Sequence, residues 1–422
     1  MIILLAGNIV TITVSIAVFF LVAMLLVGLL LYAKMKLLPE GTVSISINDG
    51  EKKLDVNIGS SLLTTLNDNK VFLPSACGGV GACGQCRCQV TEGGGAILPT
   101  EVDFFSRKEV QDNWRLGCQV KVKSDMDIKV PESVLGVKKW ECEVISNKNV
   151  ATYIKEFLVR LPEGEHLNST PGGYVQIDIP KYNLKYSDFD IEEQFHAEWD
   201  QYKMWDLTCK NTEPTMRAYS MANYPAEGDV VMLNIRIATP PFDRSTGKFM
   251  RVSPGIASSY IFNLKQGDKV MVSGPFGEFH PILDSSREML YIGGGAGMAP
   301  LRSHILHLLK TLKITDRKIS YWYGARSKGE IFYEEDFRKL EKKFPNFTFH
   351  IALSAPLPKD NWTGYTGFIH DVIYENYLIH HDAPEDIEYY MCGPEPMANA
   401  VEIMLDNLGV PCEMLMFDDF GF

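Results

Sequence analysis

Residues 77–90 read CGGVGACGQCRCQV, and one further cysteine follows in the stretch RLGCQV, residues 115–120. Four cysteines in these stretches are separated by five, two and thirty-one residues: Cys77, Cys83, Cys86 and Cys118. Iron–sulfur clusters are held by thiolates with a short pair of this kind and one distant ligand, and the first gap is one residue longer than the plant-type spacing. We therefore predict a [2Fe–2S] centre bound by these four cysteines, and a chain that moves single electrons.

The other readings of these cysteines are a structural zinc site or a set of buried thiols. Zinc sites usually show two short paired spacings, whereas this chain has one short pair and two outlying cysteines. Cys88 follows Cys86 by two residues, and we expect a small buried hydrophobe there rather than a ligand. We expect Gly78, Gly79 and Gly81 to take positive φ and to direct backbone N–H groups at the sulfurs.

Length and charge narrow the class of protein further. A chain of 422 residues is too long for one compact core and indicates several domains. The net charge of -12, with no basic stripe, argues against nucleic acid as a partner. The other cysteines show no paired spacing, which argues against a disulfide framework and favours a reducing compartment.

The N-terminus carries a long apolar stretch. Residues 9–32 contain 24 residues without a charge, enough to cross a hydrocarbon core of about 30 Å as a helix. A cleaved signal peptide would need a basic start, and no lysine or arginine precedes the stretch. We therefore expect an uncleaved transmembrane anchor over residues 1–36, with Lys34 and Lys36 placing the C-terminal domains in the cytoplasm.

The rest of the chain divides into three textures. Residues 37–133 open with two short strands around the turn Asn48-Asp49-Gly50 and predict a β-grasp, ferredoxin-like domain. Residues 134–284 alternate apolar and polar residues as an antiparallel β-barrel does, with an acidic, aromatic insertion at 183–214 whose role the sequence does not reveal. Residues 285–422 alternate strand and helix, which predicts a doubly wound α/β domain.

Two motifs in the α/β part point to a dinucleotide. Gly293, Gly294, Gly295 and Gly297 follow a predicted strand and open a helix, where glycines let the backbone approach a pyrophosphate at the helix N-terminus. The final glycine of the G-x-G-x-x-G fingerprint is absent. Cys392 ends another predicted strand, the edge at which open α/β sheets bind ligands, so it is either a small buried residue or part of a nicotinamide pocket.

Two motifs in the barrel suggest a flavin. The strand Arg217-Ala218-Tyr219-Ser220 could pair a phosphate and stack a ring, because Arg217 and Tyr219 share a face. Further on, Gly255 precedes Ser258 and Ser259, which could cap a helix whose N-terminus binds a second phosphate. Each segment also has an ordinary reading, a strand with one exposed arginine and a serine-capped helix.

The order of these motifs resembles one family, the NADH-oxidising F subunits of the bacterial Na+-translocating NADH:quinone reductase. The resemblance covers essentially the whole chain and includes the stretches GVKKWECEVIS, RAYSMANYP, SGPFGEF, YMCGPEPM and DDFG. It implies a non-covalent FAD, a [2Fe–2S] cluster on the four cysteines and NADH as substrate. Such proteins are similar to ferredoxin–NADP+ reductases fused to a vertebrate-type ferredoxin.

The resemblance also assigns roles. Arg217 would pair the flavin pyrophosphate, Tyr219 would stack on the isoalloxazine, and Ser220 would hydrogen-bond near N5. Gly255, Ser258 and Ser259 would hold the FAD phosphates, while the glycine turn and Cys392 would face the dinucleotide. Phe420 would shield the flavin, although the extra terminal Phe422 leaves two candidates.

The implied mechanism is a hydride from NADH to FAD, then single electrons to the cluster and on to other membrane subunits of the complex. That places the chain in the bacterial inner membrane as a single-pass protein with lipid and subunit partners.

Two other functions use the same modules, an NAD(P)H-dependent reductase feeding an oxygenase and an electron-carrier ferredoxin with a binding appendage. Arg326 follows the second α/β strand, where an arginine can bind a 2′-phosphate, yet the resemblance implies NADH.

Overall fold

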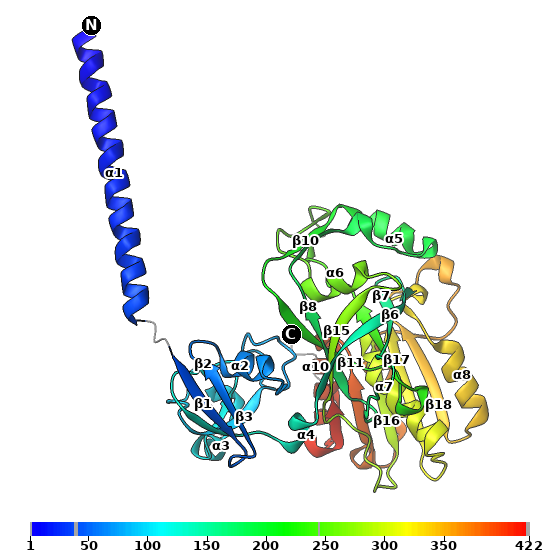
Figure 1. Ribbon diagram of the computed structural model, residues 1–422. Helices are drawn as coiled ribbons and strands as arrows, with labels where there is room; N and C mark the ends of the chain where they lie inside the picture. Colours follow the sequence, from blue (N-terminus) through cyan, green and yellow to red (C-terminus); the bar gives the residue numbers. More distant parts are fainter. Residues whose placement is uncertain (1, 38–40, 244, 419–422) are drawn as a thin grey trace. The chain divides into compact units, whose positions relative to one another are not determined.

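The computed structural model describes residues 2–37, 41–243 and 245–418. Contacts divide the chain into two compact units (Figure 1). Unit 1 is Met1–Leu73 with Cys86–Glu132, and unit 2 is Pro74–Gln85 with Ser133–Phe422.

Helix α1, Ile2–Leu37, contains the predicted apolar stretch. Its described part is exposed along its length, and large apolar side chains such as Phe19 and Leu30 are 70% and 72% exposed. Among the residues that the structure describes, side chains included, none forms a helix long and apolar enough to cross a membrane.

A five-stranded mixed sheet forms the rest of unit 1, in the order β2-β1-β5-β3-β4. Its strands are β1 Thr42–Ile47, β2 Lys52–Asn57, β3 Arg87–Glu92, β4 Trp114–Leu116 and β5 Met126–Lys129. The predicted hairpin is confirmed, since β1 pairs antiparallel with β2 around residues 48–50. β1 also pairs in parallel with β5, and helix α2, Leu62–Asp68, buries Leu62 and Leu66 completely. This is the predicted β-grasp arrangement; the short helices α3, Arg107–Gln111, and α4, Glu132–Leu135, complete the elements up to residue 135.

A buried ion pair fixes the turn that leads to Cys118. Arg115 donates to the Glu101 carboxylate at 2.7 Å, and the Leu116 N–H donates to the same carboxylate at 2.8 Å. The Glu101 side chain is fully buried, so the arginine and the backbone N–H supply the partners that water no longer can. The turn therefore has a defined conformation.

Unit 2 begins with the predicted antiparallel barrel, in the strand order β11-β8-β15-β6-β7-β12. The strands are β6 Lys138–Ala151, β7 Ile154–Arg160, β8 Tyr174–Ile179, β11 Thr215–Ser220, β12 Val230–Arg236 and β15 Lys269–Phe276. A bridge between Met221 and Leu233 joins the two end strands and closes the barrel. Alternate side chains such as Phe157 and Ile177 fill its interior, and helix α6, Ile256–Asn263, packs against the same core.

The insertion is more than a surface segment. It forms a hairpin, β9 Tyr182–Lys185 with β10 Thr208–Asn211, and helix α5, His196–Gln201. Tyr186 and Trp199 are fully buried and join Phe262 of α6 in the barrel core. A second small hairpin, β13 Phe242–Asp243 with β14 Lys248–Phe249, follows later.

The C-terminal part is the predicted doubly wound domain, a parallel sheet in the order β19-β18-β17-β16-β20-β21. The strands are β16 Met289–Gly294, β17 Ile319–Ala325, β18 Phe347–Leu353, β19 Tyr365–Thr366, β20 Glu388–Cys392 and β21 Leu415–Phe417. Helices lie on both faces: α7 Met298–Leu306 and α8 Glu334–Lys343 on one, α9 Ile369–Asn376 and α10 Glu395–Asn407 on the other. The strand order reverses between β16 and β20, which creates a crevice at their carboxyl ends.

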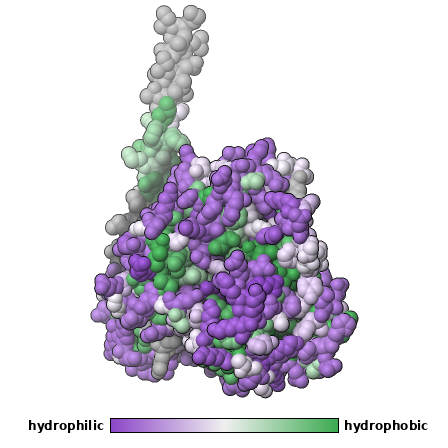
Figure 2. Space-filling model, turned by 90° about the vertical axis from the view of Figure 1, so that its right-hand side faces the viewer, coloured by the Kyte–Doolittle hydropathy of each residue, from purple (hydrophilic) through white to green (hydrophobic). Residues whose placement is uncertain are grey.

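The face of the molecule shown in Figure 2 is mostly hydrophilic, with hydrophobic patches near its centre. In helix α8 the buried side chains are Phe337 and Leu340.

Candidate functional site

A cavity of about 1330 Å³ opens inside unit 2, between the barrel and the α/β domain. Its wall includes the carboxyl ends of β16, β17 and β20, so it lies at the point where the strand order reverses. Pockets for a single small ligand usually hold about 300–1,000 Å³. This cavity therefore has room for more than one nucleotide.

The glycine turn forms part of the cavity wall, through Gly294, Gly295 and Gly297. A Cβ on Gly297 would lie 2.0 Å from the carbonyl oxygen of Cys392, and a Cβ on Gly294 would lie 2.8 Å from the sulfur of Met397. Gly295 has φ +55 with nothing within 4 Å of a Cβ. Glycine is thus needed for packing at Gly297, where the neighbour is backbone, and for backbone conformation at Gly295, whereas at Gly294 the flexible Met397 side chain could move.

The turn also exposes the start of a helix. α7 begins at Met298, directly after the turn, so its free backbone N–H groups and positive dipole end lie beside the cavity. A phosphate group is the ligand that such a backbone fits. The predicted dinucleotide turn therefore presents backbone N–H groups that suit a phosphate.

Ser220 and Cys392 meet at the floor of the cavity through a residue that the sequence reasoning did not single out, Asp418. Ser220 Oγ donates to Asp418 Oδ2 at 2.5 Å, and Cys392 Sγ donates to the Asp418 carbonyl oxygen at 3.7 Å. The Asp418 N–H in turn donates to Met391 O at 3.1 Å. All four line the cavity. The DDFG tail was the available signal, but nothing in it shows that Asp418 reaches a strand 198 residues away.

The predicted flavin residues fall into two groups. Tyr219 lines the cavity, and burial raises the pKa of its hydroxyl. Arg217 is half-buried and outside the described cavity lining; its guanidinium donates to Thr215 Oγ1 at 2.9 Å and to Met216 O at 2.7 Å. The structure brings Tyr219 to the cavity with Ser220, and Arg217 remains a predicted phosphate ligand.

The prediction that the two serines cap α6 is wrong: Gly255 is the N-cap, it makes no side-chain capping hydrogen bond, and Ser258 and Ser259 lie within the first turn of the helix. Ser258 Oγ accepts from Ala238 N and donates to Gly255 O, both at 3.1 Å. Ser259 Oγ donates to Gly255 O at 2.7 Å and lies 2.9 Å from the hydroxyl of Tyr186. Their phosphate contacts also remain predictions.

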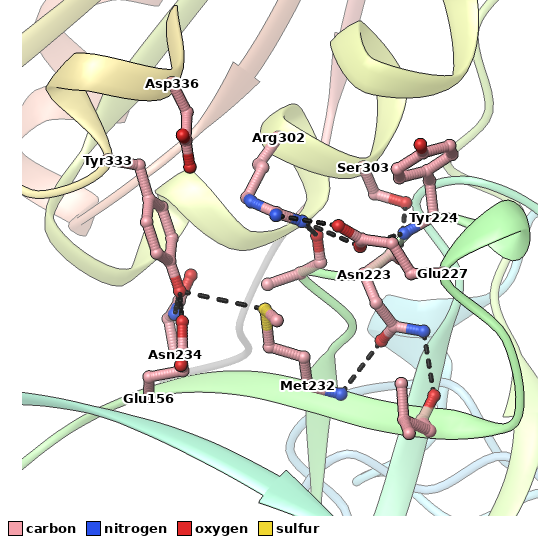
Figure 3. A network of polar contacts seen from close by, with 12 residues as sticks. Glu156, Asn223, Tyr224, Glu227, Met232, Asn234, Arg302, Ser303, Tyr333 and Asp336 are labelled. Atoms are coloured by element: carbon pink, nitrogen blue, oxygen red, sulfur yellow. Dashed lines mark hydrogen bonds and ion pairs between the residues drawn. The ribbon is translucent and has the colours of Figure 1, made fainter. Parts of the chain in front are cut away.

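A buried polar network holds the barrel against the α/β domain (Figure 3). Arg302 of α7 makes a two-point ion pair with Glu227, with both nitrogen–oxygen distances 2.9 Å. Tyr333 donates to Glu156 at 2.6 Å and accepts from Asn234 at 2.9 Å. Bidentate guanidinium–carboxylate pairs fix orientation as well as distance. The network therefore ties the barrel to the α/β domain beside the cavity, whose wall includes Asn234.

Two of the predicted cluster ligands lie in unit 2. Cys83 Sγ donates to Cys77 Sγ at 3.4 Å. This hydrogen bond, aided by the backbone N–H groups of Ala82, Cys83 and Gly79, lowers the pKa of Cys77 to about 3 against the opposing effect of burial. Gly78, Gly79 and Gly81 have φ between 70° and 91°, which confirms the predicted positive φ, and the backbone of Gly79 hydrogen-bonds to Cys77. The same hydrogen bond, together with burial, raises the pKa of Cys83, so the loop favours the thiolate, the form that binds iron, at Cys77.

The other two lie in unit 1, where Cys86 and Cys118 are buried. Gly117 N donates to Cys86 O at 2.7 Å, which ties the two segments together. Cys88 is fully buried on β3, as predicted, and burial raises the pKa of its thiol to about 12. In the part of the chain that the structure describes, no group of three or more histidine, cysteine, aspartate or glutamate side chains is arranged to hold a single metal ion. Phe420 and Phe422 lie outside the described residues.

Three family models match the chain, each in one of the predicted modules. A 2Fe-2S iron-sulfur cluster binding domain matches residues 45–123, an oxidoreductase FAD-binding domain matches 181–280, and an oxidoreductase NAD-binding domain matches 291–402. The first match contains all four predicted cysteine ligands. These matches confirm the cofactor predictions of FAD, a [2Fe–2S] cluster and NADH, and they identify the chain as an oxidoreductase.

Solved structures with the same fold include the Amycolatopsis cytochrome P450 reductase GcoB, with a TM-score of 0.61 and 23% identity over 90% of this chain and 99% of that one. The ferredoxin reductase in carbazole 1,9a-dioxygenase has a TM-score of 0.58 and 24% identity over 91% and 99%. At such low identity these likenesses concern the fold alone and do not favour an oxygenase-feeding role.

Curated relatives are far more similar. The F subunit of the Na(+)-translocating NADH-quinone reductase from Neisseria meningitidis is 55% identical over 407 residues, which cover 96% of this chain and 98% of the relative. The proteins of the same name from Actinobacillus succinogenes and Klebsiella pneumoniae are each 54% identical over 96% of this chain. The chain therefore belongs to the family of F subunits of the Na(+)-translocating NADH-quinone reductase.

Proposed function

We propose that this chain is the electron-input subunit of a Na+-translocating NADH:quinone reductase, oxidising NADH and passing electrons to partner subunits. The observation that carries the proposal is the cavity of unit 2, where the glycine turn, Cys392 and Ser220 meet between an FAD-binding and an NAD-binding module. The relatives that bear this name match nearly the full length of the chain.

FAD, when bound, would supply the redox chemistry, since a flavin can accept a hydride from NADH and pass the electrons singly to a one-electron carrier such as a [2Fe–2S] cluster. The chain's own task is to place the two nucleotides face to face and keep water out. Tyr219 supplies a ring for stacking beside Ser220, while the start of α7 supplies N–H donors for the phosphates of NADH.

The Ser220 hydroxyl acts as an oriented donor and acceptor in this proposal. Because the Ser220 hydroxyl donates its hydrogen bond to Asp418, the oxygen lone pairs of Ser220 remain available to a group in the cavity. Cys392, which donates to the Asp418 backbone, sets the position of the carboxylate from the other side. We propose Ser220 and Cys392 as catalytic residues and Asp418 as the residue that positions them.

Phe420 is proposed as the ring that covers the flavin until NADH arrives. Asp418 is held at the end of β20 and lines the cavity. Two residues of extended chain span up to about 7 Å, enough for Phe420 to reach into the same cavity.

For the cluster, we propose Cys77, Cys83, Cys86 and Cys118 as ligands. The Sγ atoms of Cys77 and Cys83 lie 3.4 Å apart, close enough for both thiolates to serve one cluster, and binding iron would require Cys83 to lose its proton. The boundaries proposed for the modules are 37–133 for the cluster domain, 134–284 for the barrel with its insertion 183–214, and 285–422 for the NADH domain.

We also propose that residues 1–36 anchor the chain in the bacterial inner membrane, with lipid and the other subunits of the complex as partners. The support is the uncharged stretch of residues 9–32 followed by Lys34 and Lys36, which favour the cytoplasmic side. Such an anchor would hold the NADH-oxidising domains beside the subunits that receive electrons.

Anaerobic titration of the purified full-length protein with NADH tests the function. We expect the flavin absorbance to bleach, followed by the electron paramagnetic resonance signal of a reduced [2Fe–2S] cluster. A protein that binds FAD but is reduced only by another donor would contradict the proposal. A protein that NADH reduces, but that does not restore quinone reduction to a complex depleted of its own NADH-oxidising subunit, would favour a different acceptor.

A further inference from the structure

Arg326 follows the second strand of the NAD-binding domain, one residue after β17 ends at Ala325. It lines the cavity together with Ala325, the last residue of β17, and Ser354, the first residue after the adjacent parallel strand β18. In dinucleotide-binding sheets, this edge reads the ribose next to adenine: an acidic side chain accepts from its 2′-hydroxyl, or an arginine binds a 2′-phosphate. An arginine here would ordinarily favour the phosphorylated dinucleotide.

In this chain, however, Arg326 is engaged by two carboxylates. Its Nη2 lies 3.0 Å from Glu198 Oε2, and its Nε lies 3.2 Å from Glu330 Oε1. The Arg326 side chain is 44% exposed, while those of Glu198 and Glu330 are 17% and 9% exposed. Arg326 and Glu330 both line the cavity, while Glu198 contacts the guanidinium from outside the described lining.

A second arginine belongs to the same cluster. Arg236 of β12 lies 3.6 Å from Glu330 Oε2, so Glu330 bridges two guanidinium groups. Arg236 and Arg326 also lie over the ring of Tyr153, at 5.7 and 5.9 Å from its centroid, and Tyr153 donates to Glu198 at 3.2 Å. Two cations and two carboxylates sum to zero, and each is held by the others.

The cluster connects three parts of unit 2. Glu198 is on α5 of the insertion, Arg236 on the barrel, and Arg326 with Glu330 on the NAD-binding domain. The insertion thus places the Glu198 carboxylate against Arg326, which lines the cavity. Glu198 itself lies outside the described lining. This gives a chemical role to the segment whose function the sequence did not reveal.

We propose that Glu198 and Glu330 make the cavity select a dinucleotide with a free 2′-hydroxyl and reject its 2′-phosphorylated form. A 2′-phosphate carries about −1.5 to −2 charge near neutral pH. It would have to enter beside two fixed carboxylates and compete with them for Arg326. A 2′-hydroxyl brings no charge and loses nothing by the pairing, so the two ligands differ mainly because the carboxylates occupy Arg326, the group that would bind the phosphate. The inference rests on the proposed function, because it assumes that NADH binds in this cavity.

The test is the ratio of kcat/KM for NADPH to kcat/KM for NADH, measured on the full-length protein with an artificial electron acceptor. We expect Glu198→Gln to raise this ratio on the order of tenfold, since one unit charge a few ångströms away in a protein-like dielectric is worth at least that much. Glu193→Gln is the matched control, an exposed carboxylate of the same insertion, and it should leave the ratio unchanged.

Further variants separate selectivity from a structural effect. Glu330→Gln should shift the ratio in the same direction. Adding Arg326→Ala to Glu198→Gln should cancel the gain, because the freed arginine is the group that would bind the phosphate.

The outcomes are distinguishable from failure of the proposed function. If the wild type does not oxidise NADH, the proposed function fails and the inference fails with it. If the wild type oxidises NADH and the ratios of Glu198→Gln and Glu330→Gln equal those of the wild type and Glu193→Gln, only the inference is overturned. A gain that survives the loss of Arg326 would also overturn it.

Discussion

The cysteine stretch and the nucleotide cavity are built in opposite ways. Three of the four proposed cluster ligands lie within ten consecutive residues, and the glycines between them set the path of the loop. The cavity instead takes its wall from Tyr153 to Asp418, segments that meet only after the barrel and the α/β sheet have formed. A site formed by neighbouring residues can be disrupted by replacing a single ligand. A site formed by distant segments is disrupted by changes in packing or in the contacts between those segments.

The largest effect is expected at the local site. Cys77→Ala should abolish the [2Fe–2S] signal, because a cluster iron cannot keep its coordination with a ligand missing. Bleaching of the flavin by NADH should persist, since no proposed flavin or NADH ligand lies in the cysteine stretch. Cys88→Ala is the control: its thiol is buried on β3 and should leave the cluster intact. Iron analysis, paramagnetic resonance and visible spectra check all three statements, and a cluster lost in Cys88→Ala but kept in Cys86→Ala would reverse the ligand assignment.

Packing at the cavity should give the next largest effect. In Gly297→Ala, the new methyl group would lie 2.0 Å from Cys392 O, so either the glycine turn or the end of β20 must move. Overpacking of this kind costs about 1–3 kcal/mol or more, and it should also weaken the binding of NADH. Gly295→Ala meets no atom within 4 Å and should cost only the left-handed backbone penalty of about 1–2 kcal/mol. Thermal unfolding and NADH titration of the two variants give the comparison; equal losses would mean that close packing at Gly297 is not what the turn requires.

These two sites show how far sequence reasoning reaches. Spacing and glycine content predict the cysteine loop, the glycine turn and the strand–helix alternation, because each is a property of neighbouring residues. Asp418 escaped because its contact with Ser220 depends on the barrel strand β11 and the tail after β21 being brought together across 198 residues. The role of Glu198 was not predicted for the same reason. An acidic residue in an aromatic insertion has the pattern of an exposed surface residue, and only the fold of α5 brings it against Arg326.

The Ser220–Asp418 pair tests whether a long-range contact matters to the reaction. Asp418→Asn keeps the shape of the side chain but removes the negative charge that strengthens the hydrogen bond from Ser220. We expect flavin reduction by NADH to slow about tenfold or more. Ser220→Ala should slow it similarly, and the double variant should be little worse than either single one, because the residues act as a unit. Stopped-flow flavin reduction measures these rates. Additive losses in the double variant would show that the two residues act separately.

The smallest effect is expected for Phe420→Ala. If this ring covers the flavin face in the resting protein, NADH must displace it in each turnover, so part of the binding free energy of NADH is used to move the ring. Removing the ring should therefore strengthen the apparent binding of NADH or speed hydride transfer a few-fold, with FAD still bound. A single aromatic stacking contact contributes about 0.5–1.5 kcal/mol beyond its buried area, which corresponds to a gain of roughly two- to tenfold.

Phe422→Ala is the matched control for this prediction, since it removes an aromatic ring two residues further along the same tail. Stopped-flow reduction at several NADH concentrations separates binding from transfer, and the flavin content of each variant reports whether the ring holds the cofactor in place. Loss of FAD from Phe420→Ala would make the ring a structural cover rather than a displaceable one. Unchanged rates and affinity in Phe420→Ala, with the gain found in Phe422→Ala instead, would move the shielding role to the last residue. The direction of the effect is the decisive reading, because a ring that takes part in binding NADH would lower the affinity when removed, whereas a ring that competes with NADH raises it.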